Sequence, residues 1–538
     1  MPTSFEHFEN GAPPTSLTSK SIRRLRSFSS EDAKKKLGIN SDAAAMRPNP
    51  IHVFWAFVAP LAGTKIVFQL LTANLYGAHR DEFYYLESGH HLAWGFVDNP
   101  PLVPLLYRVS ETIFGHSILS LAFIPALLGG IFIILGALIA ADLGGGRRAQ
   151  VVTSLVAWLG PIFLTTSHFL STTSLDLVFW SLASWLVIRM VRSGDTRLWL
   201  AVGAVCGVGL LNKDTMAFWA VAAGVGLLCT PQRKLLGSWW LAAGVAIALI
   251  IVSPNVAWEA SHHWATLEFL RNLHANNSSA DLVKFAPLQL AIVTLAGTVV
   301  CVVALRALKG RAEWRSQRWL AFGFVAAFVV LFALEGKAYY LGSWYLPLVA
   351  VGAVGVERYW SQRSGRLLAV AIVATGLLTA PIFTPILPTN VAVVAGFDTL
   401  NSDLGGMMGW PHVVNQIAAV VHALPSSESR SVVIFTNDYS EAGAVDFYGP
   451  ALDLPSAISG HNTFWFWGYG HPAPGAVVVA VGLSSFFVHH YWSSVTQVAT
   501  LGVSGPPIDP QERGVTIWVC RDQRTSWATL WPHAKHYG

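Results

Sequence analysis

The sequence predicts a polytopic α-helical membrane protein, with about eleven transmembrane helices followed by a C-terminal soluble α/β domain. Composition is the first reason, because 53% of the 538 residues are hydrophobic and only 12% are charged, with a mean hydropathy of +0.48. Ordinary soluble domains carry about 25% charged residues. Spacing is the second reason: residues 51–386 contain repeated apolar runs near the ~20 residues that cross a bilayer. After residue 390 the runs shorten and turn residues separate them.

The distribution of Lys and Arg orients these runs across the membrane. With the N-terminus inside, the segments assigned to the cytoplasm hold 23 of the 35 Lys and Arg residues, whereas the outer loops hold six. Cytoplasmic loops carry this excess in membrane proteins, so the sequence predicts an N-in, C-out topology with an odd number of spans. The predicted spans are residues 51–74, 118–142, 149–168, 172–191, 197–212, 214–230, 237–255, 285–307, 318–335, 338–356 and 366–386.

Residues 1–50 are polar and basic, and the apolar segment of a cleavable signal peptide does not follow within reach. We therefore expect a disordered cytoplasmic leader. The net charge of +5 and the pI of about 9.0 reflect this leader and the cytoplasmic loops, so we expect no nucleic-acid partner. The four cysteines predict no disulfide framework, because three lie in apolar runs and Cys520 stands alone in the tail.

Two outer loops are long, at residues 75–117 and 256–284. The first predicts two amphipathic helices that lie along the membrane surface. Apolar side chains keep helical spacing on either side of the turn at residues 98–101: Tyr85, Leu86, Gly89, Leu92 and Ala93 before it, and Leu102, Leu105, Leu106, Val109 and Ile113 after it.

The first outer loop carries Arg80, Asp81 and Glu82 in succession. Adjacent carboxylates at a membrane interface are poor core residues and contribute little as isolated surface charges. A positioned carboxylate can act as a general base. The structural alternative is a helix N-terminus, where the helix dipole favours acidic side chains. The residues alone leave both interpretations open.

The Asp-Glu pair and the segment FYYLESGHHLAWGFVDNPPLVPLLY after it resemble polyprenyl-phosphate-dependent GT-C glycosyltransferases, specifically the protein O-mannosyltransferase and aminoarabinose-transferase group and its bacterial relatives. The resemblance extends from about residue 51 to 470. Its segments follow each other in the same order, and on the same predicted side of the membrane, as in the family. The further segments are STTSLDL (171–177), GLLNKDTMAF (209–218), HHWATLEFL (262–270), EGKAYYLGSWYLPL (335–348) and NDYSEAGAVDFYGP (437–450).

The resemblance implies a GT-C catalytic domain over residues 51–386 and an extracytoplasmic α/β domain over residues 390–538. It implies a polyprenyl-phosphate-linked sugar as donor and an acceptor hydroxyl or phosphate on a lipid, glycan or protein, with inversion at the anomeric carbon. Asp81 is then the general base, with Glu82 beside it. The polyprenyl phosphate leaves as an anion and needs positive charge rather than a second acid, unlike the substrate of a glycoside hydrolase.

Cations are scarce in the predicted outer loops, so those present are candidates for binding the donor phosphate. Lys337, with Tyr340 after it, resembles the family's phosphate-binding segment, and Lys213 lies in the turn between the fifth and sixth spans. Charge is costly at such positions, which favours function. The alternative is a lysine that extends its ammonium to the interface. Arg108 and Arg271 in the long outer loops are further candidates.

Asp98, Asp176 and Tyr345 are assigned to substrate binding. Asp98 stands in DNPP, where relatives often have DKPP, so Asn99 puts a lysine contact with the lipid phosphate in doubt. Asp98 alternatively caps the following helix. Asp176, near the outer end of the fourth span, either lines the sugar site or pairs with Lys213.

No metal and no other cofactor are expected, and a divalent cation is the one alternative left open. The adjacent histidines at 90–91 and 262–263 cannot readily share one ion, and a helical HxxxH with a carboxylate does not accompany them. The tail predicts a small α/β domain over the outer loops, with strands at residues 431–436, 476–482 and 515–520 and a helix at 411–423. Its aromatic segment 464–469 predicts either contact with sugar or membrane, or core packing.

These features together predict a multi-pass glycosyltransferase of the inner, or plasma, membrane, in contact with membrane lipids. One alternative is a secondary transporter or lipid flippase, a class that often shows internal repeats. The sequence shows no internal repeat, and its acidic outer loop favours an enzyme. The other alternative is a non-catalytic sensor or scaffold, which the acidic pair disfavours.

Overall fold

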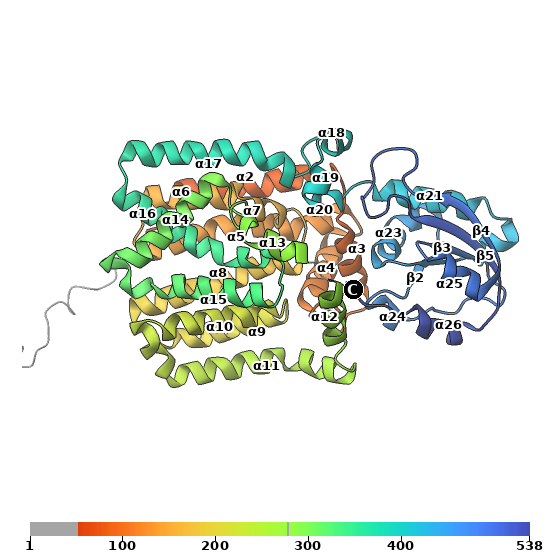
Figure 1. Ribbon diagram of the computed structural model, residues 1–538, viewed down its shortest axis with the longest axis horizontal. Helices are drawn as coiled ribbons and strands as arrows, with labels where there is room; N and C mark the ends of the chain where they lie inside the picture. The colour runs from red at the N-terminus through yellow and green to blue at the C-terminus, as the bar shows by residue number, and fades with distance from the viewer. Residues whose placement is uncertain (1–51, 277–278) are drawn as a thin grey trace, which may run out of the picture. The chain divides into compact units, whose positions relative to one another are not determined.

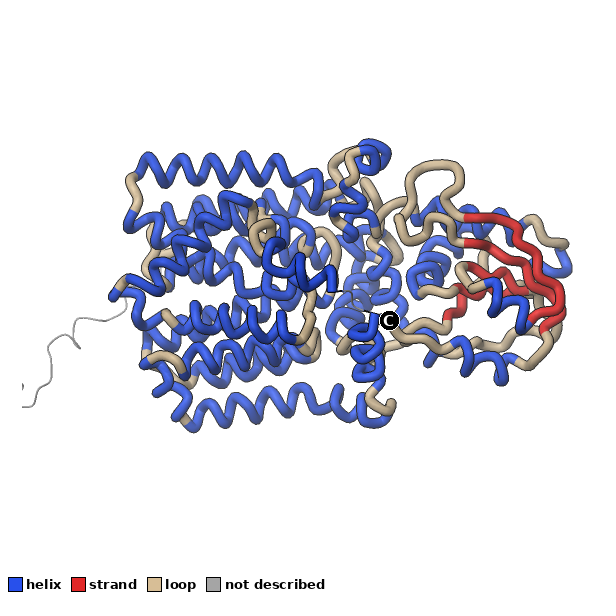
Figure 2. Tube along the Cα trace, viewed as in Figure 1, coloured by secondary structure: helices blue, strands red, loops and turns tan. Residues whose placement is uncertain are grey.

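The computed structural model describes residues 52–276 and 279–538, and the predicted leader lies outside these residues. Ile51–Gly538 forms one compact unit. Figure 1 shows a bundle of long helices and a smaller part built on a sheet, with α3 (Arg80–His90) and α4 (Leu102–Phe114) between them. The bundle is formed by the first part of the chain and the sheet by the last part (Figure 1), and Figure 2 shows all the strands gathered in the smaller part.

Every predicted span contains a helix. The bundle helices are α2 (Trp55–Thr72), α5 (Ile118–Asp142), α6 (Arg147–Leu159), α7 (Pro161–Thr165), α8 (Thr172–Ser193), α9 (Leu198–Leu210), α10 (Thr215–Leu228), α11 (Trp239–Ser261), α14 (Leu295–Gly310), α15 (Trp319–Ala333), α16 (Tyr345–Tyr359) and α17 (Gln362–Phe383), with the 3-10 helices η2 (Pro231–Gly237), η3 (Ala312–Gln317) and η4 (Ala338–Trp344). In the described part of the chain, six helices are long and apolar enough to cross a membrane, and α9, α10 and α15 are shorter apolar helices. The protein is a multi-pass membrane protein.

Two predicted spans are broken rather than continuous. Residues 149–168 form α6 and α7 on either side of Gly160, because Pro161 lacks the amide that would continue α6 and instead begins α7. Residues 285–307 start in α13 (Ser279–Leu288) and resume as α14 only after Thr294, whose φ is 73°. Hydropathy does not reveal either break.

Glycines bring neighbouring bundle helices into backbone contact. A Cβ on Gly203 of α9 would lie 2.1 Å from the carbonyl oxygen of Gly244 in α11. A Cβ on Gly352 of α16 would lie 2.0 Å from the carbonyl oxygen of Val300 in α14. Small residues at helix crossings permit such close packing inside a membrane.

The first outer loop forms two helices, α3 and α4, as its spacing predicts. Helix α3 ends at His90, before Leu92 and Ala93, and its predicted apolar face is buried in the protein rather than exposed to lipid. On α4 the predicted apolar face is the exposed one, with Leu105 44%, Val109 45% and Ile113 65% exposed. Val103 and Tyr107 on the opposite face are buried. An exposed apolar face fits a helix that lies in a lipid surface. The second long loop forms α12 (Ala265–Asn276) and α13.

The C-terminal domain is a five-stranded mixed sheet in the order β2-β1-β3-β5-β4. Strand β1 is parallel to β2 and β3, whereas β5 is antiparallel to β3 and β4. The strands are β1 (Val433–Thr436), β2 (Ala457–Ser459), β3 (Val478–Val481), β4 (Trp492–Thr500) and β5 (Thr516–Gln523). The remaining helices are α18 (Thr389–Val394), α19 (Phe397–Leu400), α20 (Ser402–Gly405), α21 (Trp410–His422), α22 (Ser426–Ser429), α23 (Tyr439–Tyr448), η5 (Gly449–Leu452), α24 (Phe464–Trp467), α25 (Ser485–Tyr491) and α26 (Trp527–Ala534).

Helices cover both faces of the sheet, because successive strand residues point to opposite faces. Ile434 and Val479 join one buried cluster with α21 and α23, whereas Phe435 and Val478 join another with α25 and α26. The three predicted strands coincide with β1, β3 and β5, and the predicted helix coincides with α21. Strands β2 and β4 were not predicted.

Helix α3 is the point where the C-terminal domain meets the first outer loop. A Cβ on Gly443 of α23 would lie 2.7 Å from the Cβ of Phe83, so the two helices touch closely. The Phe83 ring packs against Trp410 (5.5 Å between ring centres) and Phe447 (5.6 Å). The acidic pair at the start of α3 therefore lies beside the C-terminal domain.

Candidate active site

The first turn of α3 separates the two acidic side chains. His79 is the N-cap: its Nδ1 accepts a hydrogen bond from the Asp81 amide (3.2 Å), and Glu82 Oε2 accepts one from the His79 amide (2.8 Å). This capping box gives two helix-end amides a partner. The Glu82 side chain is therefore folded back onto the helix start, whereas the Asp81 side chain remains 32% exposed.

The two oxygens of the Asp81 carboxylate have different surroundings. Tyr439 of the C-terminal domain donates a hydrogen bond to Oδ1 (2.9 Å), and Arg80 Nε lies 4.0 Å from the same oxygen. Oδ2 lies 3.8 Å from His79 Nδ1, but these atoms form no ion pair. That nitrogen already accepts from the Asp81 amide, and burial lowers the pKa of His79, so the ring is neutral. Among the described residues nothing donates to Oδ2, which leaves it available to take a proton.

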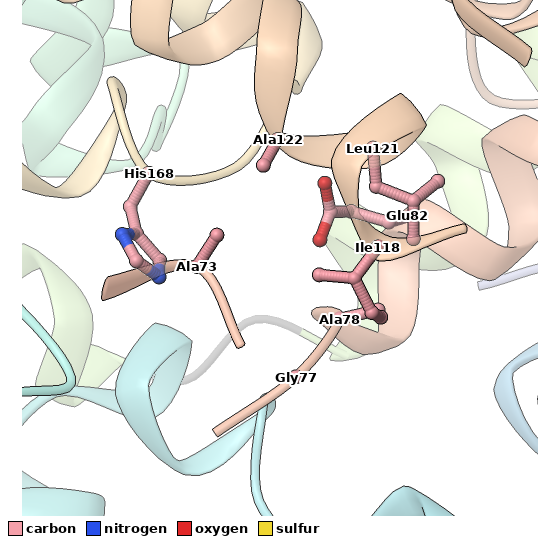
Figure 3. Close-up of a pocket in the computed structure, with 8 residues that line it drawn as sticks. All are labelled: Ala73, Gly77, Ala78, Glu82, Ile118, Leu121, Ala122 and His168. Atoms are coloured by element: carbon pink, nitrogen blue, oxygen red, sulfur yellow. The ribbon is translucent and has the colours of Figure 1, made fainter. Parts of the chain in front are cut away.

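Glu82 is buried on the opposite side of the helix start. Its Oε1 lies 2.8 Å from the Tyr107 hydroxyl, which also lies 2.8 Å from the Leu170 carbonyl. Burial raises the pKa of Glu82 to about 7, although hydrogen bonds from His79 and Tyr107 oppose the rise. Figure 3 shows Glu82 and His168 on opposite sides of a cavity of about 10 Å³, roughly the space for one water. These contacts support the turn that carries Asp81, and a direct catalytic role for Glu82 stays a prediction.

Asp98 lies close enough to Asp81 for the two carboxylates to interact electrostatically. Its Oδ1 accepts a hydrogen bond from the Tyr84 hydroxyl (2.5 Å), and its Oδ2 accepts one from Asn462 (3.4 Å). Burial raises the pKa of Asp98 to about 6 against the effect of Tyr84, and the charge of Asp81 adds to the rise. Helix α4 begins after Pro101 without a side-chain cap, so the capping alternative for Asp98 is wrong.

Lys213 and Asp176 meet near the start of α8. The Lys213 ammonium donates to the Thr173 hydroxyl (3.0 Å) and lies 3.9 Å from the centre of the Tyr340 ring. Asp176 Oδ2 accepts from the Thr215 hydroxyl (2.9 Å). Lys213 and Asp176 attract each other without a direct ion pair among the described residues. Three predicted site residues are thus neighbours here: Asp176 of α8, Lys213 of the turn before α10 and Tyr340 of η4.

Lys337 and Tyr340 lie within electrostatic reach of the Asp81 site. Lys337 is exposed at the N-cap of η4. Burial raises the pKa of Asp403, whose charge interacts with both Asp81 and Lys337. Burial also raises the pKa of Tyr85, and the charges of Asp81 and Tyr340 raise it further. Of the predicted phosphate-binding residues, Lys337 and Tyr340 therefore share charged neighbours with Asp81.

The other predicted residues have neighbours outside this group. Arg108 is exposed and pairs with Glu111 (3.1 Å), and Arg271 is exposed on α12. The Tyr345 hydroxyl donates to Gln289 (3.2 Å). Their binding roles stay predictions.

An open cleft of about 350 Å³ lies next to the Asp98 network. Thr463 lines it, and the Thr463 hydroxyl lies 2.6 Å from that of Tyr84, the donor to Asp98. Two stacked ring pairs also line it: Trp258 on His262 (4.1 Å between ring centres) and His91 on Trp467 (4.6 Å). Within the aromatic segment, Phe464 is buried and Phe466 lines the cleft, so the segment divides between core packing and an exposed surface.

The histidines that invited a metal interpretation have other contacts. His90 lies 3.1 Å from Glu87 and 2.8 Å from Glu111, and His91 and His262 stack on tryptophan rings. Within residues 52–276 and 279–538, no three His, Cys, Asp or Glu side chains are grouped so as to hold a metal ion. Metal independence stays an expectation.

Sequence reasoning missed Tyr439 and Asp403 as members of the site. Tyr439 lies in NDYSEAGAVDFYGP, a segment that the resemblance singled out without giving it a role. That segment was the available signal for Tyr439. Asp403 lies outside every segment that carried the resemblance, and the sequence held no comparable signal for it.

Comparison with known proteins is consistent with this geometry. The family model of dolichyl-phosphate-mannose-protein mannosyltransferases matches residues 98–258. The lipopolysaccharide core galacturonosyltransferase RgtA of Rhizobium johnstonii is 24% identical over 269 residues, which cover 47% of this chain and 52% of that protein. The undecaprenyl phosphate-alpha-4-amino-4-deoxy-L-arabinose arabinosyl transferase 1 of Pseudomonas fluorescens is 25% identical over 301 residues, which cover 52% of this chain and 54% of that protein. The chain thus spans about half the length of these curated relatives.

The solved structures extend the likeness to nearly the whole fold. ArnT from Cupriavidus metallidurans bound to undecaprenyl phosphate superposes with a TM-score of 0.59 at 16% identity, over 87% of this chain and 98% of that one. The apo state of the same protein superposes with a TM-score of 0.61 at 16% identity, over 86% of this chain and 98% of that one. The chain has the ArnT-like GT-C fold. The family model, the curated relatives and this fold together confirm the resemblance to polyprenyl-phosphate-dependent GT-C glycosyltransferases.

Proposed function

We propose that this protein transfers a sugar from a polyprenyl-phosphate donor to an acceptor hydroxyl or phosphate on a lipid, glycan or protein. The observation that carries the proposal is Asp81, a carboxylate with one oxygen held by Tyr439 and the other available. The names of the two curated relatives, a galacturonosyltransferase and an arabinosyl transferase, support this class. A transporter or flippase would need no such base.

Asp81 acts as the general base. Its Oδ2 takes the proton of the acceptor group while the acceptor oxygen attacks the anomeric carbon of the donor sugar. The bond between that carbon and the phosphate oxygen breaks, and the polyprenyl phosphate leaves with the electron pair. Attack from the side opposite to the leaving group inverts the configuration. Asp98, within reach of Asp81, is placed to bind the sugar or the acceptor.

Lys337, Lys213 and Tyr340 bind the donor phosphate in this proposal. They lie around η4 and the start of α8: both lysines interact with Tyr340, and Lys337 also interacts with Asp403, a neighbour of Asp81. Hydrogen bonds from charged donors to phosphate are among the strong ones, and lysine binds phosphate as a point charge. The ArnT structure was obtained with undecaprenyl phosphate, which is the lipid we propose as carrier here.

The eleven predicted spans place α3 and the C-terminal domain on the extracytoplasmic side of the inner membrane. The support is the excess of Lys and Arg in the segments assigned to the cytoplasm. The exposed apolar face of α4 supports a position of the first outer loop at the lipid surface.

The decisive experiment is mass spectrometry of envelope glycans and glycolipids from cells with and without the gene. Loss of the gene should remove one sugar from one envelope component, and the wild-type gene should restore it. Asp81→Asn should lower restoration by at least ~100-fold at normal protein level, because the isosteric amide cannot take a proton. Asp195→Asn, an exposed acid on the predicted cytoplasmic side, is the matched control and should restore fully. Full restoration by Asp81→Asn would overturn the proposal.

A further inference from the structure

The segment NDYSEAGAVDFYGP lies in the soluble domain, far along the chain from the first outer loop, yet it reaches Asp81. The Tyr439 hydroxyl donates to Asp81 Oδ1 across 2.9 Å, a contact between residues 358 positions apart. The Tyr439 ring lies 4.8 Å from the rings of Tyr84 and His461. The hydroxyl is therefore directed by packing on two sides rather than free to rotate away.

The residue before Tyr439 fixes the helix that carries it. Asp438 is the N-cap of α23: its Oδ1 accepts from the Ser440 amide (2.8 Å), and its Oδ2 lies 3.2 Å from His461 Nδ1. Burial alone would raise the pKa of Asp438, but hydrogen bonds from His461 and Ser440 outweigh it and lower the pKa to about 2. Asp438 is thus charged at any working pH, and the cap stays in place. Glu441 completes the capping box by accepting from the Asp438 amide (3.1 Å).

The charged and titratable groups around Asp81 come from five parts of the chain. They are His79, Arg80, Glu82 and Tyr85 at α3, Asp98 before α4, Tyr339 in η4, Asp403 in α20 and Tyr439 in α23. Three of these neighbours are acids, which disfavour a further negative charge. Arg80 and the phenol of Tyr439 favour it.

We propose that Tyr439 is a positioning residue by which the C-terminal domain completes the active site, holding one oxygen of the Asp81 carboxylate and turning the other toward the acceptor. The inference rests on the proposed function, since it assigns a support to the general base. A hydrogen bond to Oδ1 stabilises the carboxylate and fixes the plane of the group. Of the two Asp81 oxygens, Oδ2 is then the one to which no described residue donates.

Carbodiimide labelling of the purified full-length protein tests this without a donor or an acceptor. A carbodiimide reacts with the protonated carboxyl, so the extent of labelling at Asp81, read by peptide mass spectrometry across a pH series, reports its protonation. Tyr439→Phe removes the hydrogen-bond donor to the Asp81 carboxylate, so Asp81 takes up a proton more easily. The pH at which labelling of Asp81 is half-maximal, called the half-point below, should rise by ~1–2 pH units. Equal half-points in Tyr439→Phe and wild type would overturn the proposal.

Tyr448→Phe is the matched control. Tyr448 is the last residue of α23, and its hydroxyl meets the backbone of Ala78 just before α3. The variant therefore loses one hydroxyl contact between the same two elements without touching Asp81. Its half-point should equal that of wild type. A rise as large as in Tyr439→Phe would mean that loosening the contact, rather than losing the donor, is responsible, and would overturn the proposal.

Asp438→Asn provides a second variant that keeps the phenol. Loss of charge at the cap weakens its contact with His461, so the half-point should move in the same direction by a smaller amount. An unchanged half-point in both Asp438→Asn and Tyr439→Phe would refute the positioning role. Because the labelling needs no sugar, it distinguishes failure of the proposed function from failure of the role proposed for Tyr439. If Asp81→Asn leaves transfer intact, the proposed function fails; if transfer is lost but labelling does not shift, only the role of Tyr439 fails.

Discussion

Asp81 and Glu82 are neighbours in the sequence but occupy opposite environments. Successive residues of a helix point about 100° apart, and the capping box draws Glu82 back over the helix start. Glu82 is 4% exposed, whereas the Asp81 side chain is 32% exposed. The acidic pair is therefore one acid available for chemistry and one acid that builds the turn. The helix N-terminus alternative considered from sequence describes Glu82, whereas the general-base role of Asp81 stays a prediction.

Glu82→Gln should make the protein more stable at alkaline pH and leave it unchanged in acid. The pKa of Glu82 rises from 4.5 in the unfolded chain to about 7 in the folded protein, so the folded state binds the proton more tightly. Stability from this group is then present below pH 4.5 and is lost as the pH rises toward 7. Glutamine can accept from His79 and donate to Tyr107, whose hydroxyl then donates to Leu170.

Thermal unfolding in detergent between pH 5 and 8.5 measures this effect. The difference between 4.5 and about 7 limits the gain to ~1–3 kcal/mol above pH 7. Sugar transfer should largely persist, because Glu82 supports the turn rather than the acceptor. A stability gain that is equal at pH 5 and pH 8.5 would contradict the assignment of the proton to Glu82.

Lys337→Ala should weaken binding of undecaprenyl phosphate by roughly ten- to a hundredfold. Hydrogen bonds to charged groups contribute about 1.5–3 kcal/mol, and the exposed Lys337 ammonium has no hydrogen-bond or ion-pair partner among the described residues. Tyr340→Phe should cost less, because a neutral hydroxyl contributes about 1 kcal/mol. Titration of undecaprenyl phosphate into purified protein measures both changes.

Lys234→Ala is the control for the loss of an exposed positive charge, since Lys234 lies in η2 on the predicted cytoplasmic side. Its affinity should match that of wild type. Equal affinities of Lys337→Ala and wild type would leave Lys337 as a topology anchor. The phosphate role would then move to Lys213, which already contacts Thr173 and Tyr340.

At the scale of elements, the sequence predicts helices well wherever a long apolar run exists. The span 118–142 is matched residue for residue by α5. The spans broken at Gly160 and at residues 289–294 read as continuous, because hydropathy averages over a window and does not register where the backbone turns. Strands β1, β3 and β5 were found because they are short apolar runs. Strand β4 was missed because it is only partly buried and its sequence, WSSVTQVAT, carries little apolar alternation.

The candidate site was predictable in its local parts and not in its long-range parts. Asp81 was identifiable from the acidic pair in the first outer loop, Lys213 as a charge that interrupts apolar surroundings, and Tyr340 from the segment that carries the resemblance. Tyr439 was not, because its hydrogen bond to Asp81 depends on how α23 packs against α3. Periodicity describes the face of one element and gives no information about which distant element will cover it.

At the scale of the whole molecule, the C-terminal domain contacts the outer loops at several places, and two of these contacts involve different loops. One is the contact of α23 with α3 that carries Tyr439. The other is the chain end, where Asn272 of α12 donates to the Tyr537 carbonyl (3.1 Å) and Lys535 pairs with Glu268 (2.9 Å). The C-terminal domain thus contacts both long outer loops. The side of the membrane on which this domain lies is therefore also the side on which Asp81 lies.

The last prediction concerns that side. In a chain whose four cysteines are replaced by alanine, a cysteine at Ser431 should react with a membrane-impermeant maleimide in right-side-out vesicles. A cysteine at Gln362 should react only after the membrane is opened. Both positions are exposed, Ser431 just before β1 and Gln362 at the start of α17, so access depends on the membrane and not on burial. An odd number of spans with the N-terminus inside requires this pattern, since α17 then runs from the cytoplasmic to the outer side. The reversed pattern would mean that the span count is even or the orientation is inverted, and Asp81 would then face the cytoplasm.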